Sequence, residues 1–146
     1  MVDIKAKPDV LRRAVAAGTI HLRPATLAAI RAGRVEKGDP IAAAEVAGLQ
    51  AIKSTWQTLP HCHPIPLTFA AVEFKLGKDR VECTATVEAT YKTGVEMEAL
   101  YGVSVALLTV WDMVKSLEKD ARGQYPSARI EGIQVVSKTK GRSSAR

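Results

Sequence analysis

The stretch RVECTATVEATY, residues 80–91, alternates apolar and polar side chains without a break. A period of two places alternate side chains on opposite faces of an extended chain, so this stretch predicts a strand with one buried face. The preceding residues 67–76, LTFAAVEFKL, are rich in strand formers, and residues 77–79 supply a turn. We therefore expect a β-hairpin and a sheet that is at least partly antiparallel.

A long helix is expected next, from about Gly94 to Asp120. Thr93 followed by Glu96 fits a capping box. Apolar residues then recur every three or four positions, at Leu100, Val103, Leu107, Val110 and Val114. This periodicity predicts that one face of the helix packs on the sheet.

Shorter patterns complete the order of elements. Two helices are expected over 24–32 and 39–56, because each range begins with or near a proline. A further strand is expected over 128–137 and a short one near 19–22. This order favours an α+β fold, a ferredoxin-like sandwich with a mainly antiparallel sheet packed by helices.

The chain has 146 residues, a length that suits one domain with a single core. We expect that domain to span residues 1–137. Residues 138–146, KTKGRSSAR, contain four basic groups and no acidic one. They are expected to form a basic flexible tail, with attraction of phosphate groups as its alternative role.

Charge and cysteine content restrict the partners and the compartment. The net charge of +6 favours an anionic partner, either a phosphorylated small molecule or a nucleic-acid backbone. The two cysteines, Cys62 and Cys83, are too few for a disulfide framework. No signal-peptide core or run of ~18 apolar residues is visible, so we expect a cytoplasmic protein that is neither exported nor membrane-spanning.

Three prolines hold the stretch LPHCHPIP, residues 59–66, in an extended conformation. His61 and His63 then project to one side and Cys62 to the other. Imidazoles titrate near neutral pH, so this loop suits phosphate binding or proton transfer. A metal site and a purely structural turn are the alternatives, although no second Cys or His cluster is present to complete a tetrahedral site.

The expected long helix carries candidate groups at both ends. Its N-terminal amides attract anions, and Glu98 can accept hydrogen bonds from the edge of a base. Near the other end, Asp112 and Lys115 share one face, where each can keep the other ionised; an ordinary surface ion pair is the alternative. Positions 98 and 112 lie about 21 Å apart along a helix, so a ligand touching both predicts a site shared between two chains.

These motifs together resemble the cyclic pyranopterin monophosphate synthase family, the molybdenum cofactor biosynthesis protein C family. The resemblance covers most of the chain: MVDI-x-x-K at 1–7, KGD at 37–39, AG-x-QA-x-K at 47–53, P-x-CHP at 60–64, KTGVEMEAL at 92–100 and SVALLTV-x-DMVK at 104–115. The last two motifs in this order are specific, whereas KGD or CHP alone would mean little.

The resemblance implies a ferredoxin-like lyase of molybdopterin biosynthesis. Its reaction would convert (8S)-3',8-cyclo-7,8-dihydroguanosine 5'-triphosphate, a GTP derivative, into cyclic pyranopterin monophosphate, a pterin, and diphosphate. The family implies no organic cofactor and no protein-bound metal, although Mg²⁺ can accompany the triphosphate. It also implies a homo-oligomer, a hexamer built as a trimer of dimers, with no nucleic-acid or membrane partner.

The family's motifs assign roles to nine residues of this chain. The implied catalytic residues are Asp112, Lys115 and Lys37. The implied substrate-binding residues are His61, Cys62, His63, Met97, Glu98 and Lys53. The chain departs from the family at His61, where many members carry leucine, and at Tyr101-Gly102, which replaces small residues.

A basic ferredoxin-like module that binds nucleic acid is the alternative function. Aromatic residues make up only 5% of the chain, and the expected strands lack the aromatic run that stacks bases in RNA-recognition sheets. A non-catalytic metal carrier that uses His61, Cys62 and His63 is a third possibility.

Overall fold

The computed structural model describes residues 1–141. In that part of the chain, seven elements follow one another: β1 (Val10–His21), α1 (Pro24–Arg31), α2 (Pro40–Thr58), β2 (Leu67–Leu76), β3 (Arg80–Tyr91), α3 (Glu96–Glu118) and β4 (Arg129–Lys140). The strands form one sheet in the order β2-β3-β1-β4, and every neighbouring pair is antiparallel. The expected α+β fold of the ferredoxin-like kind is confirmed.

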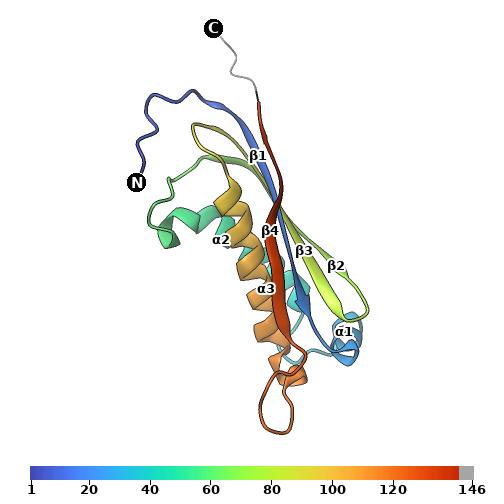
Figure 1. Ribbon diagram of the computed structural model, residues 1–146. Coiled ribbons are helices and arrows are strands. Elements are labelled where there is room, and N and C mark those ends of the chain that lie inside the picture. Colours follow the sequence, from blue (N-terminus) through green and yellow to red (C-terminus); the bar gives the residue numbers. More distant parts are fainter. Residues whose placement is uncertain (142–146) are drawn as a thin grey trace.

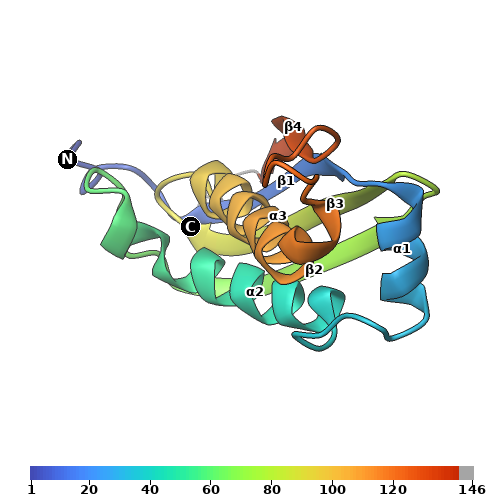
Figure 2. The ribbon, with the colours of Figure 1, turned by 90° about the horizontal axis from the view of Figure 1, so that it is seen from below.

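Helices α2 and α3 lie side by side over one face of the sheet, and α1 lies at the end of the sheet near the β2–β3 turn (Figures 1 and 2). The alternation in β3 explains this layering, because its apolar members from Val81 to Ala89 are fully buried. The hairpin of β2 and β3 has the bounds expected from the sequence. The core therefore lies between one sheet face and two helices.

The expected short strand near 19–22 is wrong in extent, because β1 spans Val10–His21 and pairs with both β3 and β4. Its buried face contains small residues, Ala14, Ala16 and Gly18, which have weak strand preference. A Cβ at Gly18 would come within 2.9 Å of Ile133. Close approach by neighbouring side chains therefore requires the small residues that conceal this strand in the sequence.

The start of α3 also differs from expectation. The helix begins at Glu96, with Val95 at its N-cap position and no capping side chain, so the expected capping box is absent. The Glu96 carboxylate instead lies 2.5 Å from the Nζ of Lys138 on β4. The length and apolar composition of α3 would also suit a membrane span, but in this structure α3 is the core helix that packs on β1 and β3.

The strand expected over 128–137 extends further, because β4 continues to Lys140, which pairs with Arg12 of β1, so residues 138–140 of the expected tail belong to the sheet. The ladder of main-chain hydrogen bonds needs no apolar side chains, so a basic sequence can extend an edge strand. Residues 142–146, the rest of the expected tail, lie outside the described residues.

The structure explains the departure at Tyr101-Gly102. Gly102 faces α2, where a Cβ would lie 2.5 Å from Cγ1 of Ile52, and Gly48 of α2 faces back toward it. Tyr101 reaches the C-terminal end of α2, where its hydroxyl lies 3.2 Å from that of Thr58. The pair therefore brings α2 and α3 close together.

Candidate active site

Lys37, Asp112 and Lys115 form one cluster near the C-terminal end of α3. The carboxylate of Asp112 accepts hydrogen bonds from both lysines, at 2.7 Å from Lys37 and 2.8 Å from Lys115. The ammonium group of Lys37 also donates to the main-chain carbonyl of Asp112, at 3.0 Å. The segment between α1 and α2 carries Lys37 to this place, which the sequence alone does not reveal.

The two ammonium groups hold the Asp112 carboxyl ionised. Its pKa falls to about 2, mainly because of the hydrogen bonds from Lys115 and then Lys37. The same contact with Asp112 raises the pKa of Lys115. Both partners are therefore charged at neutral pH, and the Asp112 carboxylate holds Lys115 in its protonated form.

An apolar shelf adjoins this cluster. Leu108, Trp111, Asp112 and Lys115 line an open hollow at the surface of α3. Trp111 is held by an edge-to-face contact with Tyr125, with ring centroids 5.8 Å apart. The shelf places flat apolar surface beside charged groups, an arrangement that suits a ring carrying polar substituents.

A second group of expected residues surrounds a cavity of about 190 Å³ at the N-terminal end of α3. Its walls come from the proline-rich loop and the start of the helix: His61, Cys62, His63, Ile65, Thr93, Gly94, Met97 and Glu98. Burial, and to a smaller extent the nearby Glu98, raise the pKa of the Cys62 thiol. Cys62 is therefore a neutral thiol here and not a reactive thiolate.

Glu98 is the most unusual group in this cavity. Its side chain is only 4% exposed, and its Oε2 has no hydrogen-bond partner among the described residues. Burial raises its pKa to about 7. A buried carboxyl oxygen without a partner is costly, which makes it a candidate acceptor for a ligand's N–H groups.

A hollow of about 480 Å³ adjoins this cavity at His63. It lies between the N-terminal residues 1–5 and the side of Tyr91 and Lys92. Lys92 fixes the N-terminal segment by donating to the carbonyl of Lys5, at 3.0 Å. The space beside the histidines therefore extends under the N-terminal segment.

Arg12 and Lys138 are cationic residues that were not among the expected site residues. With Lys140 and the backbone of Gly94 they line a hollow of about 120 Å³ at the start of α3. The Nε of Arg12 is buried without a hydrogen-bond partner among the described residues. The sequence did not reveal Arg12 as a strand residue, because small residues conceal the alternation of β1, and Lys138 fell in the expected tail.

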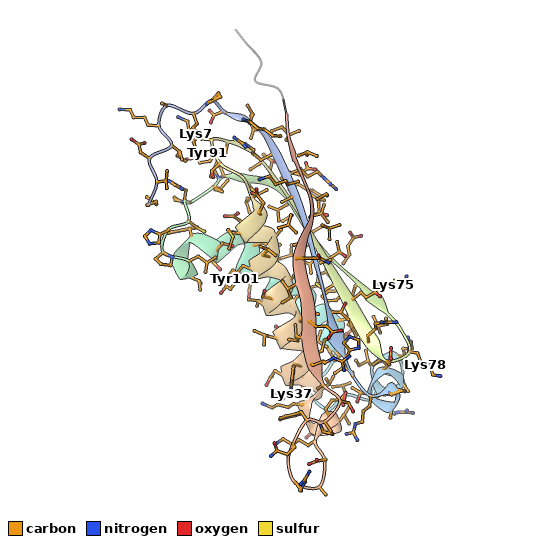
Figure 3. The ribbon with its side chains drawn as sticks, viewed as in Figure 1. Lys7, Lys37, Lys75, Lys78, Tyr91 and Tyr101 are labelled. Carbon is orange, nitrogen blue, oxygen red and sulfur yellow. The ribbon has the colours of Figure 1, made fainter. Side chains whose placement is uncertain are left out.

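The expected site residues thus fall into two groups, at opposite ends of α3. Figure 3 shows Lys37 beside the C-terminal part of the helix, and Lys7 and Tyr91 at the other end. Lys53 is exposed on α2 and lines neither the cavity at Glu98 nor the shelf at Asp112. Among residues 1–141 no three His, Cys, Asp or Glu side chains are grouped so that they could hold a metal ion.

The fold and the two groups describe an α+β ferredoxin-like protein with a Lys-Asp-Lys cluster at one end of α3 and a cavity near basic residues at the other. A model of the MoaC family matches residues 1–141. The chain belongs to the MoaC family.

Relatives of high similarity carry one name, "Probable cyclic pyranopterin monophosphate synthase". The protein from Methanoregula boonei is 62% identical over 141 residues, covering 97% of this chain and 91% of the relative. The protein from Thermococcus onnurineus is 58% identical over 140 residues, covering 96% of this chain and 90% of the relative. The protein from Pyrococcus furiosus is 56% identical over 140 residues, with the same two coverages.

Proposed function

We propose that this protein is a cyclic pyranopterin monophosphate synthase, a lyase of molybdenum cofactor biosynthesis. It converts (8S)-3',8-cyclo-7,8-dihydroguanosine 5'-triphosphate into cyclic pyranopterin monophosphate and diphosphate. The observation that carries the proposal is the convergence of Lys37, Asp112 and Lys115, in a chain whose relatives bear the name of this synthase.

The reaction needs several proton transfers in one pocket, because the imidazole part of the purine opens, a pyrazine ring forms and a cyclic phosphate closes. We assign the acid-base steps to Asp112 and Lys115 and a second proton transfer to Lys37, because the two lysines both lie within hydrogen-bond distance of Asp112. Protonated lysines also stabilise the negative charge that develops as diphosphate leaves.

The other end of α3 supplies recognition. Glu98 has a buried oxygen without a hydrogen-bond partner among residues 1–141, which suits the N–H edge of a guanine-derived ring. Arg12 and Lys140 offer positive charge beside the first residues of α3, which suits phosphate oxygens, whereas Lys138 is paired there with Glu96. The cavity at Glu98 is also lined by His61, His63 and Met97. Lys53 lies outside this cavity, so it contacts a phosphate group only if a second subunit brings the ligand to it.

We further propose that each site is shared between two subunits of a hexamer, a trimer of dimers. Glu98 and Asp112 are 14 residues apart on one helix, or about 21 Å, which is too far for one ring to touch both within a chain. The Glu98 end of one subunit and the Asp112 end of its neighbour would complete the pocket.

The reaction has no net redox change, so we propose no organic cofactor; Mg²⁺ would enter with the triphosphate as part of the substrate. We also propose that the protein acts in the cytoplasm as a soluble enzyme, with no nucleic-acid or membrane partner. The cysteines support this placement, since Cys62 and Cys83 are both free thiols.

The test is incubation of the purified protein with the cyclised nucleotide, with and without Mg²⁺. The expected result is release of diphosphate together with a product that becomes a fluorescent pterin after oxidation. The matched control is Asp112→Asn, which keeps the shape of the side chain and removes its charge. A folded wild-type protein that releases neither product overturns the proposed function.

A further inference from the structure

Arg23 contacts the end of α3 without touching the cluster of Lys37, Asp112 and Lys115. It lies between β1 and α1 and occupies the N-cap position of α1. Its amide donates to Oε1 of Glu118 at 2.7 Å, and its Nε donates to Oε2 at 3.1 Å. Both oxygens of one carboxylate are thus bound by a single residue.

The same guanidinium group caps α3 from outside. Its Nη2 donates to the carbonyl of Leu117 and lies 3.5 Å from that of Lys119. Carbonyl groups in the last turn of a helix lack partners within the helix, so another segment must satisfy them. Arg23 therefore fixes the direction in which the C-terminal end of α3 meets the start of α1.

Glu118 makes this contact more than a surface ion pair. Its side chain is fully buried, at 0% exposure, and its hydrogen-bond partners among residues 1–141 both belong to Arg23. A buried carboxylate that loses its partner is strongly destabilised in its charged form. The junction between Arg23 and Glu118 therefore favours one arrangement of the start of α1 against the end of α3.

The catalytic cluster depends on the two elements that this junction joins. Asp112 and Lys115 lie on the last two turns of α3. Lys37 lies on the segment that leaves α1, six residues after Arg31, and crosses to Asp112. Val35 packs in the core and ties that segment to the rest of the fold between α1 and Lys37.

We propose that Arg23 is a positioning residue for the catalytic cluster: by joining the start of α1 to the last turn of α3, it sets the approach of Lys37 to Asp112. The inference rests on the proposed function only in assigning that cluster to catalysis. Lysine cannot replace Arg23, because one ammonium group cannot bind a carboxylate and two carbonyls in this planar arrangement.

The test compares Arg23→Ala and Arg23→Lys with Arg31→Ala. Arg31 is a matched control, because it also lies on α1 and donates to two main-chain carbonyls, but these belong to Leu76 and Gly77 of the β2–β3 hairpin. Steady-state kinetics give kcat and KM. An NMR titration of the Asp112 carboxyl carbon reports the contact with Lys37 without using activity.

We expect both Arg23 variants to lower kcat at least about tenfold, with KM changed less than about threefold, because small misplacements of reacting groups cost rate. The pKa of Asp112, about 2 in the wild type, should rise as the hydrogen bond from Lys37 is lost. Arg31→Ala should leave kcat and this titration at wild-type values.

Two results overturn the inference: a folded Arg23 variant in which Asp112 titrates as in the wild type, or an Arg31→Ala variant with the same losses. If Arg23→Ala does not fold, Glu118→Gln replaces it, since the amide keeps one acceptor oxygen and removes the buried charge. It should give a smaller rise in the Asp112 pKa. If the wild type shows no turnover but Arg23→Lys still shifts the titration of Asp112, the proposed function is wrong and the positioning role of Arg23 stands.

Discussion

Lys37 and Asp112 are 75 residues apart in sequence, yet Nζ of Lys37 lies 2.7 Å from Oδ2 of Asp112. Lys115 binds the other carboxylate oxygen, so one acidic group is shared by two ammonium groups. All three side chains are about half exposed, between 45% and 55%. Exposed ion pairs contribute little to folding, so this cluster is accessible to a ligand at small cost in stability.

Replacing Lys37 or Lys115 with Ala should abolish turnover while the fold stays intact. Loss of a proton-transfer group costs about 10²- to 10⁴-fold in rate, whereas loss of an exposed ion pair costs about 1 kcal/mol or less. Diphosphate release and thermal unfolding measure the two effects. Lys78→Ala, at the β2–β3 turn far from the cluster (Figure 3), is the control. Retained turnover in either cluster variant would refute the catalytic roles.

Mixing a Glu98→Gln variant with an Asp112→Asn variant should restore part of the activity. If each site takes Glu98 from one subunit and Asp112 from another, mixed oligomers contain some sites with both groups intact. The measurement is turnover after the two inactive variants are unfolded together and refolded, with each variant refolded alone as the control. Absence of rescue in oligomers shown to contain both chains contradicts a shared site.

Glu98 should make the protein less stable as the pH rises from about 4.5 to about 7. Burial raises its pKa from 4.5 to about 7, so folding favours the protonated form, and its contribution is lost as pH passes the folded value. The loss corresponds to about 3 kcal/mol. Urea unfolding measures the free energy of unfolding at several pH values. The difference in this free energy between the wild type and Glu98→Gln should change with pH across this range. Parallel curves for the two proteins would show that Glu98 has an ordinary pKa.

Arg12→Ala should weaken the binding of diphosphate and raise KM more than it lowers kcat. The buried Nε of Arg12 has no partner among residues 1–141, so a phosphate oxygen is its natural acceptor. Inhibition by added diphosphate measures the change, which we expect to be about tenfold, as for one charged hydrogen bond. Arg129→Ala is the control, because Arg129 lies at the other end of β4 and pairs with Glu131. Equal inhibition of all three proteins contradicts a phosphate site at Arg12.

Gly102→Ala should destabilise the protein by about 1–3 kcal/mol, because the new methyl group would meet Ile52 of α2. The paired variant Gly102→Ala/Ile52→Val should recover part of this loss by making room. Thermal unfolding measures both. Stability equal to the wild type in Gly102→Ala would show that α2 and α3 adjust without cost.

Much of the fold follows from local periodicity in the sequence. The alternation of residues 81–91 determined β3 and its buried face, and the three-to-four spacing from Leu100 to Val114 determined α3. Both patterns are strong because large apolar side chains mark the buried side. The proximity of Asp112 to Lys115 also followed, since residues three apart share a helix face.

Other features depended on contacts between segments distant in sequence. The sequence did not reveal the length of β1, because its buried positions hold Ala and Gly. Small residues are needed there because neighbouring side chains approach the strand closely. The β4 extension to Lys140 depends on a partner strand rather than on its own composition. The contact between Lys37 and Asp112 depends on how the chain packs α1 against α3. Sequence periodicity reports which face of an element is buried, but only the packed chain decides which charged groups meet.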